Sequence, residues 1–361
     1  MEHPLIQCNS QQHRMTMQPN RKLDLHIGLP KTGSSTIQTF LHSQRQEISK
    51  QSIEIPTCLG PYSHYKLALM FYSTNHKADF LAKNNHLQTT EERLRFRALW
   101  EASLKEELES KPSQQWIISS EFLQHCLQAE HEITSLAEML RQYFNEINLL
   151  LYVRKPIHAA VSMMSTEVKM GKPKFEIERP AYYRNLCHHQ QTITIWQNAF
   201  RPNHFKINDF DSQQKHGTLL QDFCKHTGIT WKDSFRHTQR SNQSLSLEGL
   251  QIMTSLNRQM RASKTKVDTR KRFRFIDYVI KHYQGTDNYK ATNKQSKEFY
   301  DYYHTSNAWL KQTQGINYVE GFTKSLASAQ DQHQTKTSTI TDSEAMEIWK
   351  QWNARVDQQS R

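Results

Sequence analysis

Short apolar runs alternate with longer amphipathic segments through the first two thirds of the chain. A compact apolar run bounded by polar or turn-forming residues is typical of a buried strand. The run at residues 147–153, INLLLYV, is the clearest of these. Further strands are expected at residues 23–28, 52–56, 116–119 and 204–207.

Between these strands, apolar residues recur at helical spacing. Helices are predicted at residues 91–109, 132–144, 156–170 and 184–200, and Pro156 stands at a first turn, where proline is favoured. Strands that alternate with helices are usually joined by crossovers, which makes neighbouring strands parallel. The pattern therefore predicts a three-layer, P-loop-like α/β fold with a mostly parallel central sheet.

Beyond about Asp209 the pattern is only helical, with candidate helices at residues 219–226, 246–260, 275–283 and 297–310. We expect one large domain at residues 22–325 with a helical C-terminal third. Residues 1–21 are polar and are predicted to form a disordered leader. Residues 326–361 are rich in Gln, Thr and Ser, which predicts a loosely attached polar tail with a short helix at 343–352.

Charge and cysteine content narrow the context. The 47 Lys and Arg residues exceed the 35 Asp and Glu residues, so the formal charge is +12 and anionic partners are favoured. Five scattered cysteines argue against a disulfide framework; they are Cys8, Cys58, Cys126, Cys187 and Cys224. No signal peptide is readable and no run approaches the roughly 18 apolar residues of a membrane span. A cytoplasmic protein without a membrane span is expected.

The first segment that carries chemistry follows the strand at 23–28. Backbone N–H groups and the dipole at a helix N-terminus favour an anion there, and small hydroxyl residues and a lysine add donors. The candidate anion-binding residues are Pro30, Lys31, Thr32, Gly33, Ser34, Ser35 and Thr36. A Walker loop would place its lysine directly after the last glycine, whereas Lys31 precedes Gly33.

The second segment begins where the strand at 147–153 ends. Arg154 follows this strand, and Ser162 lies eight residues later on the predicted helix. Open α/β sheets bind ligands at the carboxyl ends of their strands. A guanidinium and a hydroxyl in these places can converge on one phosphate.

Both segments resemble those of a known family. Residues 26–40, HIGLPKTGSSTIQTF, resemble the 5′-phosphosulfate loop of sulfotransferases that use PAPS (3′-phosphoadenosine 5′-phosphosulfate), and especially a bacterial branch similar to glycan sulfotransferases. Residues 149–171, with Arg154 and Ser162, are similar to the family's 3′-phosphate motif. The resemblance implies sulfuryl transfer from PAPS to a hydroxyl or amine, with PAP (3′-phosphoadenosine 5′-phosphate) as the product and a carbohydrate as the favoured acceptor.

The resemblance also implies that Lys31 stabilises the leaving phosphate, without a metal. The late RKGxxGxWK-like segment of cytosolic members is absent. Two interpretations of the basic stretch at 258–274 stay open: it replaces this segment, or it is a solvated basic helix face. Residues 242–246 and the pair Ser306 and Asn307 are similar to bacterial members, but no chemistry can be assigned to them.

A base must accept the proton of the acceptor. Glu121, just after the strand at 116–119, is the first candidate, and His64 is the second. Each also has a structural interpretation: Glu121 as a charge at a helix N-terminus, His64 as a packed loop residue. We expect Cys187, His188 and His189 to lie on a surface helix rather than to bind metal.

Two other functions remain open. A P-loop nucleotide kinase or NTPase would need a lysine after Gly33 and an acidic Mg²⁺ ligand at a strand end, and neither is evident. A basic nucleic-acid-binding protein would use the stretch at 258–274. No nucleic-acid motif is present, so no such partner is expected.

Overall fold

The computed structural model describes residues 20–73, 80–237, 244–264, 268–285, 288–319 and 340–359. Most of the expected leader and the first part of the expected tail lie outside these ranges, so the proposed domain boundaries stay predictions. Within the described ranges, no helix is long and apolar enough to cross a membrane.

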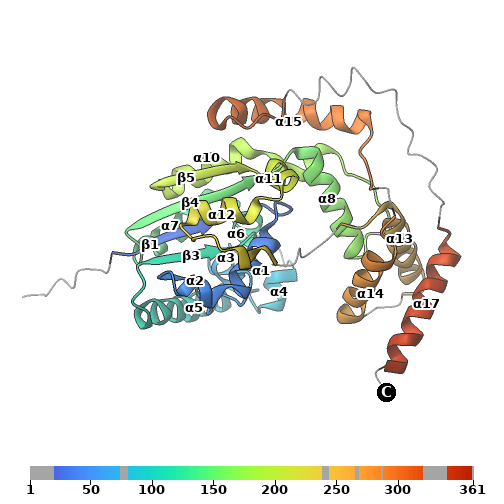
Figure 1. The fold of residues 1–361 in the computed structure, drawn as a ribbon, viewed down its shortest axis with the longest axis horizontal. Coiled ribbons are helices and arrows are strands. Elements are labelled where there is room, and N and C mark those ends of the chain that lie inside the picture. The colour runs from blue at the N-terminus through green and yellow to red at the C-terminus, as the bar shows by residue number, and fades with distance from the viewer. Residues whose placement is uncertain are drawn as a thin grey trace, which may run out of the picture.

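A five-stranded parallel sheet forms the centre of the molecule, which confirms the predicted α/β class (Figure 1). Its strands are β1 (Lys22–His26), β2 (Ile53–Glu54), β3 (Gln115–Ser119), β4 (Glu146–Val153) and β5 (His204–Asp209). Their order across the sheet is β2-β3-β1-β4-β5. Strand β1 is central, and its Leu23 pairs with Trp116 on one side and Ile147 on the other. The carboxyl ends of all five strands therefore meet at one edge.

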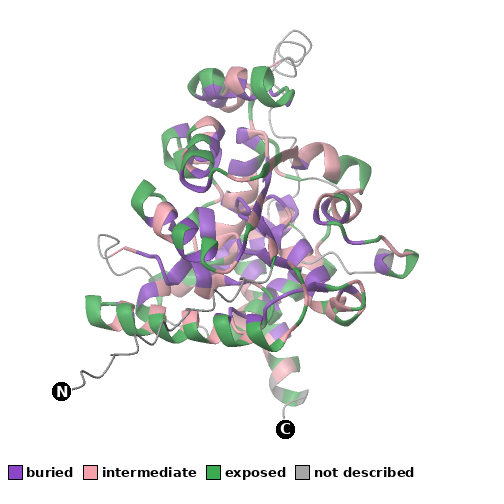
Figure 2. Cartoon of the chain, turned by 90° about the vertical axis from the view of Figure 1, so that its left-hand side faces the viewer, coloured by how far each residue is buried: buried purple, intermediate pink, exposed green. Residues whose placement is uncertain are grey.

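Each face of the sheet has its own apolar core. Alternation along β4 sends Leu149 and Leu151 into one core and Leu150 and Tyr152 into the other. Helices α5 (Thr90–Ser110), α7 (Glu130–Arg141) and α10 (His189–Phe200) contribute to the first, and α1 (Ser34–Ser43), α2 (Arg45–Ser49) and α12 (Leu219–Thr227) to the second. Figure 2 shows the buried residues gathered between these helical layers.

The remaining helices are α3 (Tyr65–Leu69), α4 (Phe80–Asn84), α6 (Phe122–Cys126), α8 (Pro156–Lys169), α9 (Arg184–Cys187), α11 (Phe210–His216), α13 (Leu247–Ala262), α14 (Thr269–His282), α15 (Asn293–Gln314) and α17 (Asp342–Gln359), with 3₁₀ turns at Pro180–Tyr183 and Asp233–His237. The helix predicted at 184–200 is broken at His188. Its backbone leaves the helical region, and its ring accepts a hydrogen bond from the Gln191 N–H at 3.3 Å, which starts a new helix.

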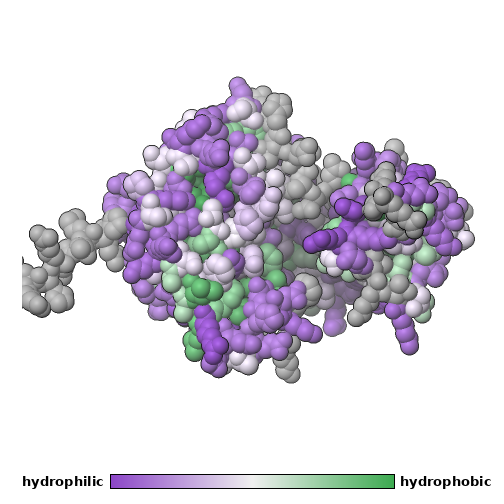
Figure 3. All heavy atoms as spheres, turned by 90° about the horizontal axis from the view of Figure 1, so that it is seen from below, coloured by the Kyte–Doolittle hydropathy of each residue, from purple (hydrophilic) through white to green (hydrophobic). Residues whose placement is uncertain are grey.

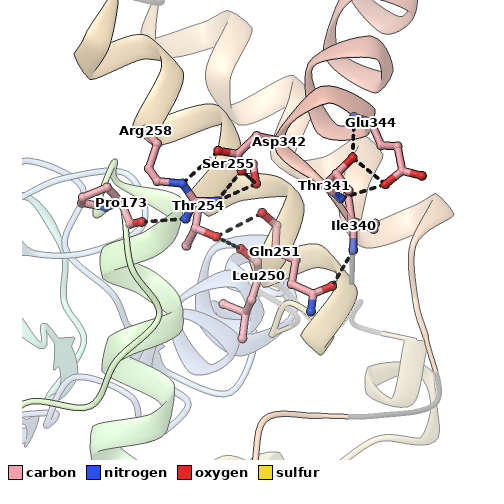
Figure 4. A network of polar contacts seen from close by, with 10 residues as sticks. All are labelled: Pro173, Leu250, Gln251, Thr254, Ser255, Arg258, Ile340, Thr341, Asp342 and Glu344. Carbon is pink, nitrogen blue, oxygen red and sulfur yellow. Dashed lines mark hydrogen bonds and ion pairs between the residues drawn. The ribbon is translucent and has the colours of Figure 1, made fainter. Parts of the chain in front are cut away.

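Helices α13, α14 and α17 form a helical lobe beside the sheet (Figure 1). The ring of Phe275 packs against Trp349 and Trp352, which come from α17. Figure 4 shows the polar side of this junction, where Asp342 pairs with Arg258 and accepts a hydrogen bond from Ser255 Oγ at 2.6 Å. Helix α17 spans the predicted 343–352 segment and is packed against α13, so its apolar face is buried.

Candidate functional site

The loop between β1 and α1 is shaped by two glycines. Gly33 precedes α1 with φ +80°, and a Cβ there would lie 2.5 Å from Leu219 Cδ2 and 2.8 Å from the Phe210 ring. At Gly28, with φ +24°, a Cβ would lie 2.8 Å from Ser34 Oγ. Any side chain at either position would displace the loop, because only glycine combines these backbone angles with so little space.

The hydroxyl groups of the loop divide into two kinds. Thr32 Oγ1 and Ser34 Oγ both donate to the Leu29 carbonyl, at 2.7 and 3.2 Å, and so hold the loop closed. Ser35 and Thr36 are half-buried in the first turn of α1, and Pro30 is half-buried in the loop. The first N–H groups of a helix have no intrahelical acceptor, so those of Ser34 and Ser35 suit an anion.

Lys31 is the cation of this loop. Its backbone is left-handed, with φ +70°, and its Nζ donates to Thr166 Oγ1 on α8 at 2.5 Å. Burial lowers the pKa of Lys31, the neighbouring Glu121 carboxylate opposes this, and the charge of Arg154 adds to it. The Glu121 carboxylate and the Arg154 guanidinium therefore both lie within electrostatic reach of Lys31 at the carboxyl edge of the sheet.

Arg154 connects the first segment to the second. Its Nη1 donates to the Lys31 carbonyl at 2.9 Å, and its Nε donates to Asp211 Oδ1 at 3.2 Å. Its guanidinium also lies 5.0 Å from the centre of the Phe210 ring. Contacts from the β1–α1 loop and from α11, which carries both Phe210 and Asp211, thus hold the side chain in one orientation.

Sequence reasoning missed Asp211. Its Oδ2 accepts a hydrogen bond from the Lys155 N–H at 2.8 Å, and His158 Nδ1 lies 3.1 Å from its Oδ1. Burial alone would raise its pKa, but His158, Arg154 and the Lys155 N–H outweigh burial and hold the pKa below its usual value. The usable signal was its position just past β5, whose carboxyl end lies beside that of β4.

A cavity of about 420 Å³ opens between α8 and α15. Arg154, which precedes α8, and Ser162, which lies on α8, line one part of it. Ser244, Lys290 and Asn307 line it from the C-terminal third. Asn307 is only 2% exposed, and its Oδ1 has no hydrogen-bond partner among the described residues. The segments at 242–246 and 306–307 thus each place a residue in one cavity with Arg154, while Asn242 and Gln243 lie outside the described residues.

The first base candidate, Glu121, lies at the start of α6. Gln38 Nε2 donates to Glu121 Oε2 at 2.5 Å, which orients the carboxylate. Gln38 was not singled out from the sequence, although it lies one helical turn after Ser34 and so shares a face of α1 with the anion-binding loop.

His64, the second candidate, is fully buried. Its Nδ1 accepts a hydrogen bond from the Ser119 N–H at 2.9 Å, and burial lowers its pKa to about 4. The ring therefore binds the backbone at the end of β3, whereas Glu121 faces the charge of Lys31. Of the two candidates, Glu121 is therefore the one near Lys31.

Two further residues of α8 face the loop. Ser162, Thr166 and Lys169 share one side of the helix by their spacing, a signal available in the sequence. Burial, and after it the charge of Lys31, lowers the pKa of Lys169 to about 8, while Asp277 opposes them. Helix α8 thus places a second lysine near Lys31.

The basic stretch at 258–274 does not line the cavity at any of its described positions. Arg258 pairs with Asp342, and Arg272 donates to the Lys169 carbonyl at 2.6 Å. These two arginines hold the helical lobe together and against α8. Lys266 lies outside the described residues.

The expectation of a surface helix at residues 187–189 is wrong. Cys187 and His189 are buried, and the Nε2 of His189 lies 2.9 Å from the Arg154 carbonyl oxygen, within hydrogen-bonding distance. Among the described residues, no group of three or more His, Cys, Asp or Glu side chains could hold a metal ion.

No protein-family model matches this chain, and no curated protein matches it in sequence. Two solved structures show a loose likeness. A sulfotransferase from Alicyclobacillus acidocaldarius is 13% identical with a TM-score of 0.36, over 70% of this chain and 99% of that one. The sulfotransferase domain from the curacin biosynthetic pathway is 13% identical with a TM-score of 0.32, over 62% and 79%.

Proposed function

We propose that this protein is a PAPS-dependent sulfotransferase that transfers a sulfuryl group to a hydroxyl or amine, with a carbohydrate as the favoured acceptor. The observation that carries the proposal is the direct link between the two anion-binding segments. Arg154 donates to the backbone of Lys31 while lining the same cavity as Ser162. One donor with phosphates at both ends would satisfy both segments.

The donor would lie across this link. Its 5′-phosphosulfate would accept hydrogen bonds from the N–H groups of Ser34 and Ser35, with the hydroxyls of Ser35 and Thr36 beside it. Its 3′-phosphate would meet Arg154 and Ser162, because a fixed guanidinium binds phosphate oxygens in pairs. Lys290 lines the same cavity and would contact the donor. In cytosolic sulfotransferases the RKGxxGxWK-like segment, which is absent here, covers the donor.

The proposed reaction needs one base and one cation. The acceptor oxygen or nitrogen attacks sulfur in line, the bond from sulfur to the bridging oxygen of PAPS breaks, and PAP leaves with the electron pair. Glu121 takes the acceptor proton, and protonated Lys31 stabilises the charge on the departing phosphate. Since burial lowers the pKa of Lys31, this cation is lost at a lower pH than an ordinary lysine, and transfer is expected to decline as pH rises through that pKa.

The cysteines fit a reducing compartment such as the cytoplasm. Cys58, Cys126, Cys187 and Cys224 form no disulfide bond among the described residues. We therefore place the proposed reaction in the cytoplasm.

Calorimetric titration of the full chain with PAP, 5′-AMP and ATP–Mg²⁺ tests the donor site. We expect micromolar or tighter PAP binding and weaker 5′-AMP binding. Arg154→Ala and Lys290→Ala should each weaken PAP about tenfold or more, with little effect on 5′-AMP, because they remove contacts to the 3′-phosphate. Arg95→Ala, on the exposed surface of α5, is the matched control.

Lys290 is exposed, so its variant folds even if Arg154→Ala does not. PAP binding that is absent, or that is unchanged in Lys290→Ala and in a folded Arg154→Ala, would contradict the donor site. Tighter Mg²⁺-dependent ATP binding would favour a nucleotide kinase instead.

A further inference from the structure

The backbone at the end of β4 is bound by side chains from three distant parts of the chain. Tyr318 Oη lies 3.2 Å from the carbonyl oxygen of Val153. His189 Nε2 lies 2.9 Å from the carbonyl oxygen of Arg154. The N–H of Lys155 donates to a carboxylate of α11 at 2.8 Å. Three consecutive residues, with the proposed phosphate-binding arginine in the middle, are thus each fixed through a backbone group.

These contacts are shielded from water. His189 and Tyr318 are only 1% and 5% exposed. A carbonyl oxygen only accepts, so His189 Nε2 carries the proton, and burial keeps the ring neutral by lowering its pKa to about 4. Burial, and after it the charge of Asp209, raises the pKa of Tyr318, so its hydroxyl keeps its proton. Both side chains therefore stay hydrogen-bond donors at neutral pH, and removing either would leave a buried carbonyl unpaired.

Tyr318 reaches the side chain of Arg154 as well as its backbone. Its Oη donates to Asp209 Oδ1 at 2.6 Å, and the same oxygen accepts from the Asp211 N–H at 3.1 Å, which caps α11. Asp211 in turn accepts from Arg154 Nε at 3.2 Å. One hydroxyl group therefore supports the arginine along two routes, through the end of β4 and through the start of α11.

Across from α8, the cavity is walled by α15 and Tyr318 rather than by the helical lobe. Its lining includes Phe299, Tyr300, Asn307 and Tyr318, but no described residue of α13, α14 or α17. Figure 3, seen from the side away from α15, shows a hollow between the lobe and the larger body. In Figure 1, α15 lies above α10, the helix that begins at His189. Tyr318 thus joins the α15 wall of the cavity to the strand ends that present Arg154.

We propose that Tyr318 and His189 are positioning residues that set the affinity for the donor's 3′-phosphate by holding Arg154 in place. This inference rests on the proposed sulfotransferase function. A guanidinium binds phosphate oxygens in pairs only while its plane faces them, so a small displacement weakens both hydrogen bonds at once.

The first test is Tyr318→Phe, which removes the hydroxyl and keeps the ring. The full chain is titrated calorimetrically with PAP and with 5′-AMP, which differ by the 3′-phosphate. We expect PAP binding to weaken about tenfold and 5′-AMP binding to stay within about twofold, because only the 3′-phosphate meets Arg154 in the proposed site. In transfer, KM for PAPS should rise while kcat stays nearly unchanged.

Tyr303→Phe is the matched control. This tyrosine is also buried, and its hydroxyl donates at 2.7 Å to the backbone carbonyl of Pro180 rather than at the end of β4. Loss of this hydroxyl should lower stability to a similar extent, because it too leaves a buried carbonyl unpaired. Both nucleotide affinities should nevertheless stay within about twofold of wild type.

A double-mutant cycle shows whether Tyr318 acts through Arg154. In the Arg154→Ala background, Tyr318→Phe should weaken PAP by less than about a further twofold, because the side chain that it holds is gone. In the Lys290→Ala background it should again cost about tenfold, since Lys290 lines the cavity from another segment.

The second test compares two substitutions of His189. His189→Gln keeps an N–H donor for the Arg154 carbonyl, whereas His189→Leu removes it. We expect the preference for PAP over 5′-AMP to fall about tenfold in His189→Leu and to be largely restored in His189→Gln.

Equal weakening of PAP and 5′-AMP in Tyr318→Phe would overturn the inference. So would the same loss in Tyr303→Phe, or a full tenfold loss on top of Arg154→Ala. If Tyr318→Phe does not fold, the His189 variants decide, and an unchanged preference for PAP in a folded His189→Leu would overturn the inference. Failure of the wild type to bind PAP is a separate result, because it would refute the proposed donor site whatever holds the end of β4.

Discussion

At the residue scale, the contact between Gln38 and Glu121 orients the carboxylate that we propose as the base. The amide holds one carboxylate oxygen at 2.5 Å, and in the proposed reaction the other oxygen of Glu121 would take the acceptor proton. Lys31 lies within electrostatic reach of Glu121, which would place the proposed base and the proposed leaving group in one charge environment. His64 lacks this position, because its Nδ1 accepts from the Ser119 N–H.

Glu121→Gln should therefore abolish transfer without disturbing the donor site. We expect a loss of about 100-fold to 10,000-fold in kcat, the range for a removed general base, with PAP affinity nearly unchanged. Single-turnover transfer from labelled PAPS, beside PAP calorimetry, measures both. Full activity in Glu121→Gln, together with its loss in a folded His64→Gln variant, would assign the base to His64.

At the element scale, the docking of α17 depends on a small aromatic cluster. Trp352 is 6% exposed and its ring lies 5.1 Å from that of Phe275 on α14. Truncating a buried tryptophan costs about 3–5 kcal/mol, and an element at the edge of a structure can open at less cost than the whole chain unfolds. The polar contacts of Asp342 alone are exposed and contribute less.

Trp352→Ala should thus release α17 while the sheet and the donor site stay folded. Hydrogen exchange should speed up across 342–359 in this variant, with PAP affinity unchanged. Gln351→Ala, exposed on the same helix, is the matched control and should exchange like the wild type. Continued protection of 342–359 in Trp352→Ala would mean that other contacts hold the helix.

At the scale of the whole molecule, buried histidines couple stability to pH. His26, His64 and His189 are buried, and burial lowers their pKa values to about 3, 4 and 4. Their unfolded pKa is about 6.5, so the unfolded chain binds protons that the folded chain excludes. Their contribution is fully present above pH 6.5 and is lost as pH falls below it.

We therefore expect the free energy of unfolding to drop between pH 7.5 and pH 5, by roughly 2 kcal/mol for each buried histidine. Carboxylates with lowered pKa values, such as Glu107 at about 2, matter only below about pH 4.5, so they do not obscure this window. Urea unfolding at the two pH values gives the drop. A folded His64→Gln variant should reduce it by about a third, while exposed His304→Ala should not; no drop at all would refute the coupling.

Local patterns were enough to predict the parallel sheet, the strand–loop–helix at residues 23–43 and the placement of Arg154 and Ser162 at the end of β4 and on α8. Apolar periodicity marks a buried strand or helix without reference to the rest of the chain, and the order of Lys31 and Gly33 excludes a Walker loop by itself. Parallel strands place their carboxyl ends at one edge, so Glu121 near Lys31 followed from the predicted topology.

Only the tertiary structure decided which distant residues complete the site. Asp211 orients Arg154 across 57 positions, Thr166 accepts from Lys31 across 135, and Asn307 enters the cavity from α15. Such contacts depend on how whole helices pack against one another, and no local periodicity encodes that packing. The basic stretch at 258–274 is an example. Arg258 and Arg272 hold the lobe together, whereas Arg270 and Arg274 are exposed, because only one side of α14 packs into the lobe.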